Sequence, residues 1–282
     1  MTADAKIRSN GMEATARIAP APHLVGGFKR LIGNTLVQQL LVIVVIVGLW
    51  KIVSGPILNP YYLSTPDAVF AHIVGWVASG VLWPHLLSTT ITTILGFGIA
   101  AAVAIPLALV ISDQPFADQV VSPFIFAAYS MPKIVLAPAL ILWLGIGQLP
   151  AITLSAITAF FLVFFNLYLG LKNVPRVYTD TAALMGASRL ATALKFRLPA
   201  ASTYLATGIS QGLIYAFHGT LVGEMTSTNT GMGYLILFAG SQMDSTGVMA
   251  GLCIVGLLAV LLTRLLAHSL RVAGASVDVG NV

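Results

Sequence analysis

Six long runs of apolar residues alternate with polar segments along this chain of 282 residues. A membrane-spanning helix needs about 20 mostly apolar residues, and the runs have approximately this length. Proline and glycine within the runs are compatible with membrane helices, because neighbouring helices can satisfy the freed backbone groups. The pattern therefore predicts an all-α integral membrane protein with six transmembrane helices. The predicted spans are 36–53, 86–111, 120–146, 151–171, 204–222 and 248–266.

Proline and glycine also predict local features of these helices. Pro132 and Pro138 are expected to break the third span. Gly208 and Gly212 are four residues apart, and small residues at this spacing let two membrane helices approach closely. We expect this pair to serve packing within the chain rather than a dedicated dimer contact.

Two short helices are predicted outside the spans. The segment 67–79 mixes apolar and polar residues, with Thr65 as its expected N-cap and Pro66 at its first position. Gly231 and Gly233 predict a turn that leads into a second short helix. Both helices suit the interface between membrane and water.

The charge content supports a membrane location and also predicts the orientation. Of all residues 57% are hydrophobic and 8% are charged, whereas soluble proteins carry about 25% charged residues. The 14 Lys and Arg exceed the 9 Asp and Glu, and they gather in the polar gaps, which indicates topology rather than nucleic-acid binding. The positive-inside rule places the loop 172–199 and both termini in the cytoplasm. The chain then divides into an N-terminal tail 1–33, a transmembrane domain 34–271 and a C-terminal tail 272–282, in a prokaryotic plasma membrane.

The basic loop 172–199 has the pattern of two short helices joined by a glycine. Pro175 can begin the first helix, and Gly186 is placed to end it in a left-handed conformation. Ser188 can cap the second helix, and Pro199 is expected to stop or turn it. Each helix has an apolar stripe. The stripes could lie on lipid headgroups or dock into a groove of a cytoplasmic partner, and the pattern leaves both open.

The spacing of residues within this loop resembles the cytoplasmic EAA loop of ABC-type import permeases. That pattern is Glu-Ala-Ala, three residues, Gly, nine residues and Ile-x-Leu-Pro. Here Asp180-Thr181-Ala182 is followed at the same spacing by Gly186 and by Phe196-Arg197-Leu198-Pro199. The resemblance implies that the loop docks an ATPase subunit. The residues it implicates are Asp180, Thr181, Ala182, Gly186, Ala187, Phe196, Leu198 and Pro199.

Two further segments, 131–147 and 223–236, look like the permeases of nitrate, sulfonate and taurine importers. The resemblance implies a type I ABC importer permease fold, a second permease copy in a homodimer, two ATPase copies and an extracytoplasmic solute-binding protein. It also implies that ATP and Mg are bound by the ATPase subunits, with no cofactor in this chain. The expected partners further include membrane lipid but no nucleic acid, and the expected solute is a small anion such as nitrate, a sulfonate or taurine.

Three ionisable residues in or near the spans are candidates for the solute pathway: Lys133, His218 and Glu224. Lys133 adjoins the Pro132 break and could attract an anion, and Glu224 could contact the binding protein or pair with Lys133. Each could instead have a structural role.

The sequence contains no catalytic constellation, no metal-binding cluster and no phosphate-binding GxxxxGK[ST] loop, so we expect a transport subunit rather than an enzyme. The alternatives are an ion-coupled secondary transporter, a membrane enzyme and a scaffold. The shortage of acidic residues in the spans argues against the first.

Overall fold

A computed structural model describes residues 35–272 and divides them into two units. The first described unit is helix α2 (Thr35–Val53), whose apolar side chains are mostly exposed. The second begins at Ser54. The tails predicted at 1–33 and 272–282 lie outside the described residues, except for Val272, which ends the last helix.

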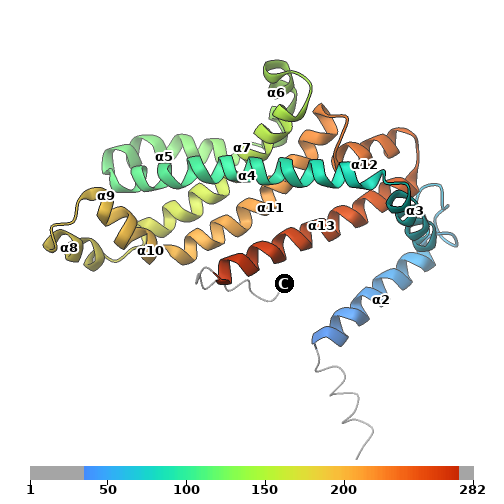
Figure 1. Ribbon diagram of the computed structural model, residues 1–282, viewed down its shortest axis with the longest axis horizontal. Coiled ribbons are helices and arrows are strands. Elements are labelled where there is room, and N and C mark those ends of the chain that lie inside the picture. The colour runs from blue at the N-terminus through green and yellow to red at the C-terminus, as the bar shows by residue number, and fades with distance from the viewer. Residues whose placement is uncertain (1–34, 273–282) are drawn as a thin grey trace, which may run out of the picture. The chain divides into compact units, whose positions relative to one another are not determined.

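The second unit is helical throughout its ordered elements, and its described residues form no strand apart from one isolated bridge between Ser54 and Leu58. Figure 1 shows α4 running between two ends of this unit, with α8, α9 and α10 at one end and α3 and α12 at the other. The helices are α3 (Pro66–Ala78), α4 (Leu82–Asp113), α5 (Pro115–Ser130), the 3-10 turn η1 (Lys133–Leu136), α6 (Ala137–Leu144), α7 (Gln148–Lys172), α8 (Arg176–Leu184), α9 (Arg189–Thr192), the π-helical turn η2 (Ala193–Arg197), α10 (Leu198–Ala200), α11 (Ser202–Ser227), α12 (Met232–Ser241) and α13 (Ser245–Val272).

Each of the six apolar runs forms helix, and the all-α membrane fold is confirmed. In the described part of the chain, three helices are long and apolar enough to cross a membrane, or four if the bent pair around Pro132 is one span. The count of six spans therefore stays a prediction. The third run bends by 86° at its break. The expected second break at Pro138 is wrong, because Pro138 lies in the first turn of α6, where its missing N–H is not needed.

Helix α7 is the centre of the second unit, and α4 and α11 pack closely against it. The close approach depends on small residues. A Cβ on Gly212 would lie 2.6 Å from Val163, and one on Gly223 would collide with the backbone of Ala151. Ser155 and Thr158 of α7 donate hydrogen bonds of 2.9 Å to backbone carbonyls of α11. The expectation that Gly208 and Gly212 serve packing within the chain is confirmed.

A cluster of large side chains holds the same three helices together near the end of α7 at Lys172. Phe164, Leu167 and Tyr168 are buried there against Ala104 and Ala108 of α4. Alanines four residues apart form a shallow row on α4 that receives these bulky side chains. This packing fixes the helix ends from which the loop 172–199 projects.

The two short helices outside the spans form where the sequence predicts them. Thr65 caps α3, and its hydroxyl accepts a hydrogen bond from the N–H of Ala68. Gly231 precedes α12 with φ at 105°, a backbone conformation that favours glycine.

Alanine substitution of two helical glycines tests whether close helix contact stabilises the fold. A Cβ at Gly219 would lie 2.9 Å from the Leu154 carbonyl, so Gly219→Ala should lower the free energy of unfolding by about 1–3 kcal/mol. Gly256→Ala is the matched control, because that Cβ meets nothing within 4 Å. Alanine is the better helix former, so the control should be neutral or slightly stabilising. Thermal unfolding in detergent measures both, and equal midpoints for the two variants would contradict the packing argument.

Candidate functional site

The first candidate site is the loop between α7 and α11, and its geometry starts with the end of α8. Gly186 has φ at 69°, as the sequence predicts. The N–H of Ala187 donates to the carbonyl of Ala182, and the N–H of Gly186 donates to that of Ala183, both at 3.0 Å. This pair of hydrogen bonds is the Schellman motif, which reverses the chain and satisfies the last carbonyls of the helix. Ser188 then caps α9 as predicted, accepting from the N–H of Ala191.

The apolar side chains of this loop mostly face away from the rest of the unit. Leu184 is 90% exposed, and Val177, Met185 and Leu190 are also exposed, while Ala182 is fully buried. Asp180 and Thr181 are exposed on the same short helix, and Ala187, Phe196 and Leu198 are half-buried. The loop therefore presents an uncovered apolar surface beside the residues that match the EAA-like pattern.

The second helix of the loop ends one residue after Pro199, and a turn at Ala201 leads into α11, in line with the expectation that Pro199 stops or turns it. The chain passes from α9 through the π-helical turn η2 and continues helically through α10 to Ala200. Proline lacks an N–H and crowds the carbonyl four residues before it. The wider π turn, in which the N–H of Leu198 donates to the carbonyl of Ala193, accommodates this.

Arg197 connects the loop to two long helices. Its side chain is 6% exposed, and its Nη1 donates to Asp113 Oδ1 at 2.8 Å. Its Nη2 reaches the carbonyls of Ser112 and Leu171, at the ends of α4 and α7. Unpaired carbonyls at helix C-termini favour a cation, so one guanidinium joins three segments. The contact also places the end of α4 on the same side as the loop 172–199.

The second candidate site is the break between α5 and η1, where Lys133 lies. The Lys133 ammonium donates to the carbonyl of Tyr129 and lies 4.6 Å from the Tyr129 ring centroid and 4.9 Å from that of Phe161. Cation–π contacts and one carbonyl stabilise the charge. No carboxylate forms an ion pair with Lys133 among the described residues.

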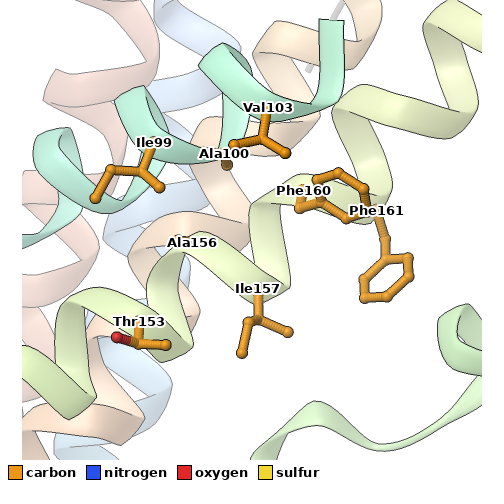
Figure 2. A pocket seen from close by; sticks show the side chains of 8 residues that line it. All are labelled: Ile99, Ala100, Val103, Thr153, Ala156, Ile157, Phe160 and Phe161. Atoms are coloured by element: carbon orange, nitrogen blue, oxygen red, sulfur yellow. The ribbon is translucent and has the colours of Figure 1, made fainter. Parts of the chain in front are cut away.

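An apolar cleft of about 360 Å³ lies between α4 and α7, and one of its lining residues is Phe161, which contacts Lys133. Figure 2 shows Ile99 and Val103 of α4 on one side, with Ile157, Phe160 and Phe161 of α7 on the other. Thr153 is the one residue with a polar side chain among those that line it. Phe161 contributes both to the cleft and to the aromatic contact with Lys133.

Glu224 does not lie at the surface where a binding protein could reach it, and it does not pair with Lys133. Its side chain is 1% exposed. Its Oε2 accepts hydrogen bonds from the Thr89 hydroxyl at 2.8 Å and from the N–H of Gly233 at 3.0 Å. Thr89 also accepts from the N–H of Met232, so the carboxyl joins α4, α11 and the start of α12. A Cβ on Gly231 would collide with this carboxyl.

His218 is exposed on α11, and its ring lies 5.7 Å from that of Tyr215. The structure thus separates the three predicted pathway residues: Lys133 adjoins the cleft, Glu224 is buried, and His218 faces outward.

Sequence reasoning missed the ion pair of Arg197 with Asp113. The signal available was an arginine inside the loop motif and an aspartate in a loop with no basic residue of its own.

Comparison with known proteins gives a consistent result. Residues 94–272 match the family described as binding-protein-dependent transport system inner membrane component. An ABC transporter permease protein of Haemophilus influenzae is 30% identical over 220 residues, covering 78% of this chain and 89% of the relative. The formylaminopyrimidine transport permease protein of Halalkalibacterium halodurans is 27% identical over 213 residues, covering 76% and 85%. An aliphatic sulfonates transport permease protein of Bacillus subtilis is 27% identical over 237 residues, covering 83% and 86%.

The fold is also similar to a solved structure, the MetNI methionine ABC transporter in inward-facing conformations. The TM-score is 0.56 at 21% sequence identity, and the match covers 68% of this chain and 93% of that chain. This likeness concerns the fold.

Replacing Arg197 tests its structural role. In Arg197→Met the apolar stem remains but the carbonyls of Ser112 and Leu171 lose their donor, so the free energy of unfolding should fall by about 1–3 kcal/mol. Lys195→Met, in the same π turn, removes an exposed charge and should change it by less than about 0.5 kcal/mol. Thermal unfolding of the purified protein compares them; an unchanged Arg197→Met midpoint would contradict the assignment.

Proposed function

Because this chain belongs to the family of binding-protein-dependent transport system inner membrane components, we propose that it conducts a small anion and that ATPase subunits drive it through the loop 172–199. The chain is a multi-pass permease subunit of an ABC importer and is not itself an enzyme, since ATP hydrolysis belongs to a separate subunit. Importers of this family work with an ATPase and a solute-binding protein.

The observation that carries the docking proposal is the exposed apolar surface of the loop. Leu184, Met185 and Leu190 face outward, while Arg197 anchors the end of the loop near α11 and Ala182 is buried within α8. An apolar surface on a firmly held support suits a groove in a folded partner. Lipid headgroups would instead be expected to contact the basic residues of the loop.

We propose two ATPase copies, one for each permease copy of a homodimer. Both termini of each permease copy lie on the cytoplasmic side.

The contacts of Arg197 suggest how movement of the loop reaches the membrane. A displacement of η2 would be carried through the guanidinium to the ends of α4 and α7. Docked ATPase subunits that close on ATP would then favour one arrangement of these helices over another. The ATPase subunits can shift the equilibrium between the two arrangements because they bind one arrangement more tightly than the other. Transport follows if the two arrangements open to opposite sides of the membrane.

Lys133 supports an anion as the solute. It is a cation at a break in a membrane helix, and ionisable residues in such places mark solute pathways. His218 and Glu224 remain candidates for the pathway by sequence, with Glu224 more suited to holding the helices in place. Relatives of this chain are named for aliphatic sulfonates, for taurine and for formylaminopyrimidine. We therefore propose a sulfonate, taurine or nitrate as the solute.

Reconstitution into vesicles with the ATPase subunits and the binding protein tests the function. We expect solute-stimulated ATP hydrolysis and uptake that stops without ATP. Uptake by this chain alone, driven by an ion gradient, would establish the alternative of a secondary transporter and overturn the proposal.

Two substitutions at Gly186 test coupling through the loop. Valine disfavours the left-handed conformation strongly, whereas asparagine adopts it more readily. Gly186→Val should reduce transport at least tenfold without equal loss of ATPase activity in the assembled complex, while Gly186→Asn should retain most of it. Normal transport by Gly186→Val would count against the loop as the coupling element.

A further inference from the structure

The broken helix, the lysine and the cleft lie together about halfway along α7. Phe161, which contacts Lys133, is 13 residues from Gln148 and 11 residues from Lys172. At 1.5 Å per residue, Phe161 is roughly 20 Å from one end of this helix and roughly 17 Å from the other, and the Lys133 ammonium lies beside its ring. A helix that crosses the membrane therefore places the ammonium near the middle of the bilayer.

Irregular backbone at this depth has a restricted set of explanations. Between Ser130 and Lys133 the chain leaves the helical conformation and bends by 86°. Non-helical backbone is tolerated within a membrane where protein buries it or where it lines a cavity. Lys133 follows this break directly, and the cleft adjoins it through Phe161. The break therefore has the position expected for the wall of a solute site.

The chemistry of the site has two parts. The Lys133 ammonium has three donors, of which one is used by the Tyr129 carbonyl. It faces two aromatic rings and no carboxylate in the described part of the chain, so its positive charge lacks a counter-ion there. The adjoining cleft is lined by aliphatic and aromatic side chains, and its volume of about 360 Å³ is within the range of small-molecule pockets.

We propose that Lys133 and the adjoining cleft together form a solute-binding subsite, which binds an organic anion at both of its ends. Lys133 binds the anionic group, and the cleft between α4 and α7 holds an apolar group of several carbon atoms. The inference rests on the proposed function and narrows it, because nitrate and taurine have no such group to fill the cleft. Phe161 links the two parts, because this residue lines the cleft and its ring contacts the ammonium.

Binding of a homologous series of alkanesulfonates tests the two parts separately. Ethane-, butane- and hexanesulfonate remain ionised at all usable pH values and differ in apolar length alone. The permease with its ATPase subunits is placed in lipid nanodiscs, and empty nanodiscs correct for partition into lipid. Affinity should increase by roughly twofold to fourfold for each added methylene that enters the cleft.

Three variants assign the effect to residues. Lys133→Met should weaken binding of all three probes at least tenfold, and Lys133→Arg should largely restore it. Ala156→Leu fills the cleft without changing a charge, so it should abolish the dependence on chain length while sparing ethanesulfonate. Gly98→Leu, on α4 where an added Cβ meets nothing within 4 Å, controls for added apolar volume.

Each alternative occupant of the cleft gives a different result. Phospholipid that co-purifies with the wild type, is lost in Lys133→Met and is not displaced by hexanesulfonate would overturn the proposal in favour of a lipid site. Loss of permease dimers in Ala156→Leu would overturn the proposal in favour of a subunit contact. Equal affinity for all chain lengths would leave no role for the cleft.

If ATP-driven uptake occurs while none of the sulfonates binds, the proposed subsite is wrong and the importer function stands. If the ATPase subunits fail to assemble with the chain, the proposed function itself is wrong.

Discussion

The arrangement of this subunit depends on how closely α11 can approach α7. Glycines on one face of α11 leave room for the backbone and side chains of α7, and hydroxyls of Ser155 and Thr158 then reach the carbonyls of α11. In a lipid environment apolar side chains gain little by leaving the solvent, so contact between backbones and interhelical hydrogen bonds must hold helices together. The close seam places large aromatic residues on the other faces of α7, where they form the core with α4. Both candidate sites are attached to this frame.

Much of the helical architecture could be predicted from the sequence, because membrane helices are specified by long apolar runs. The N-caps of α3 and α9 and the left-handed Gly186 also follow from local rules that involve a few neighbouring residues. The consequences of proline were harder to predict. Pro132 lies at a sharp bend and Pro138 lies in a regular first turn, and the difference depends on where the next helix starts. The helix ends one residue after Pro199, close to the expected position, but no pattern of residue types reveals the π turn that precedes this proline.

The candidate sites divide in the same way. The exposed surface of the loop could be predicted because the spacing of its motif lies within one short segment. The partners of Arg197 and Glu224 could not, because Asp113 and Thr89 are separated from them by 84 and 135 residues. A carboxyl in a membrane protein suggests a solute contact by residue type alone, whereas its burial against Thr89 and Gly233 identifies a structural role. The cleft beside Lys133 is likewise lined by side chains of α4 and α7, and the sequence does not show which residues of these two helices face one another.

The buried carboxyl of Glu224 has a consequence for motion. It joins α4, α11 and the first turn of α12 at one point, where sliding any of the three helices would remove a donor from a buried carboxyl oxygen. These helix ends therefore move as one rigid body. The Pro132 bend and Gly145, with φ at 79°, lie on either side of η1 and α6, and Ala137 and Leu140 of α6 pack against Leu154 of α7. A change in the angle of the Pro132 bend would therefore move Lys133, which lies in η1, relative to this fixed point.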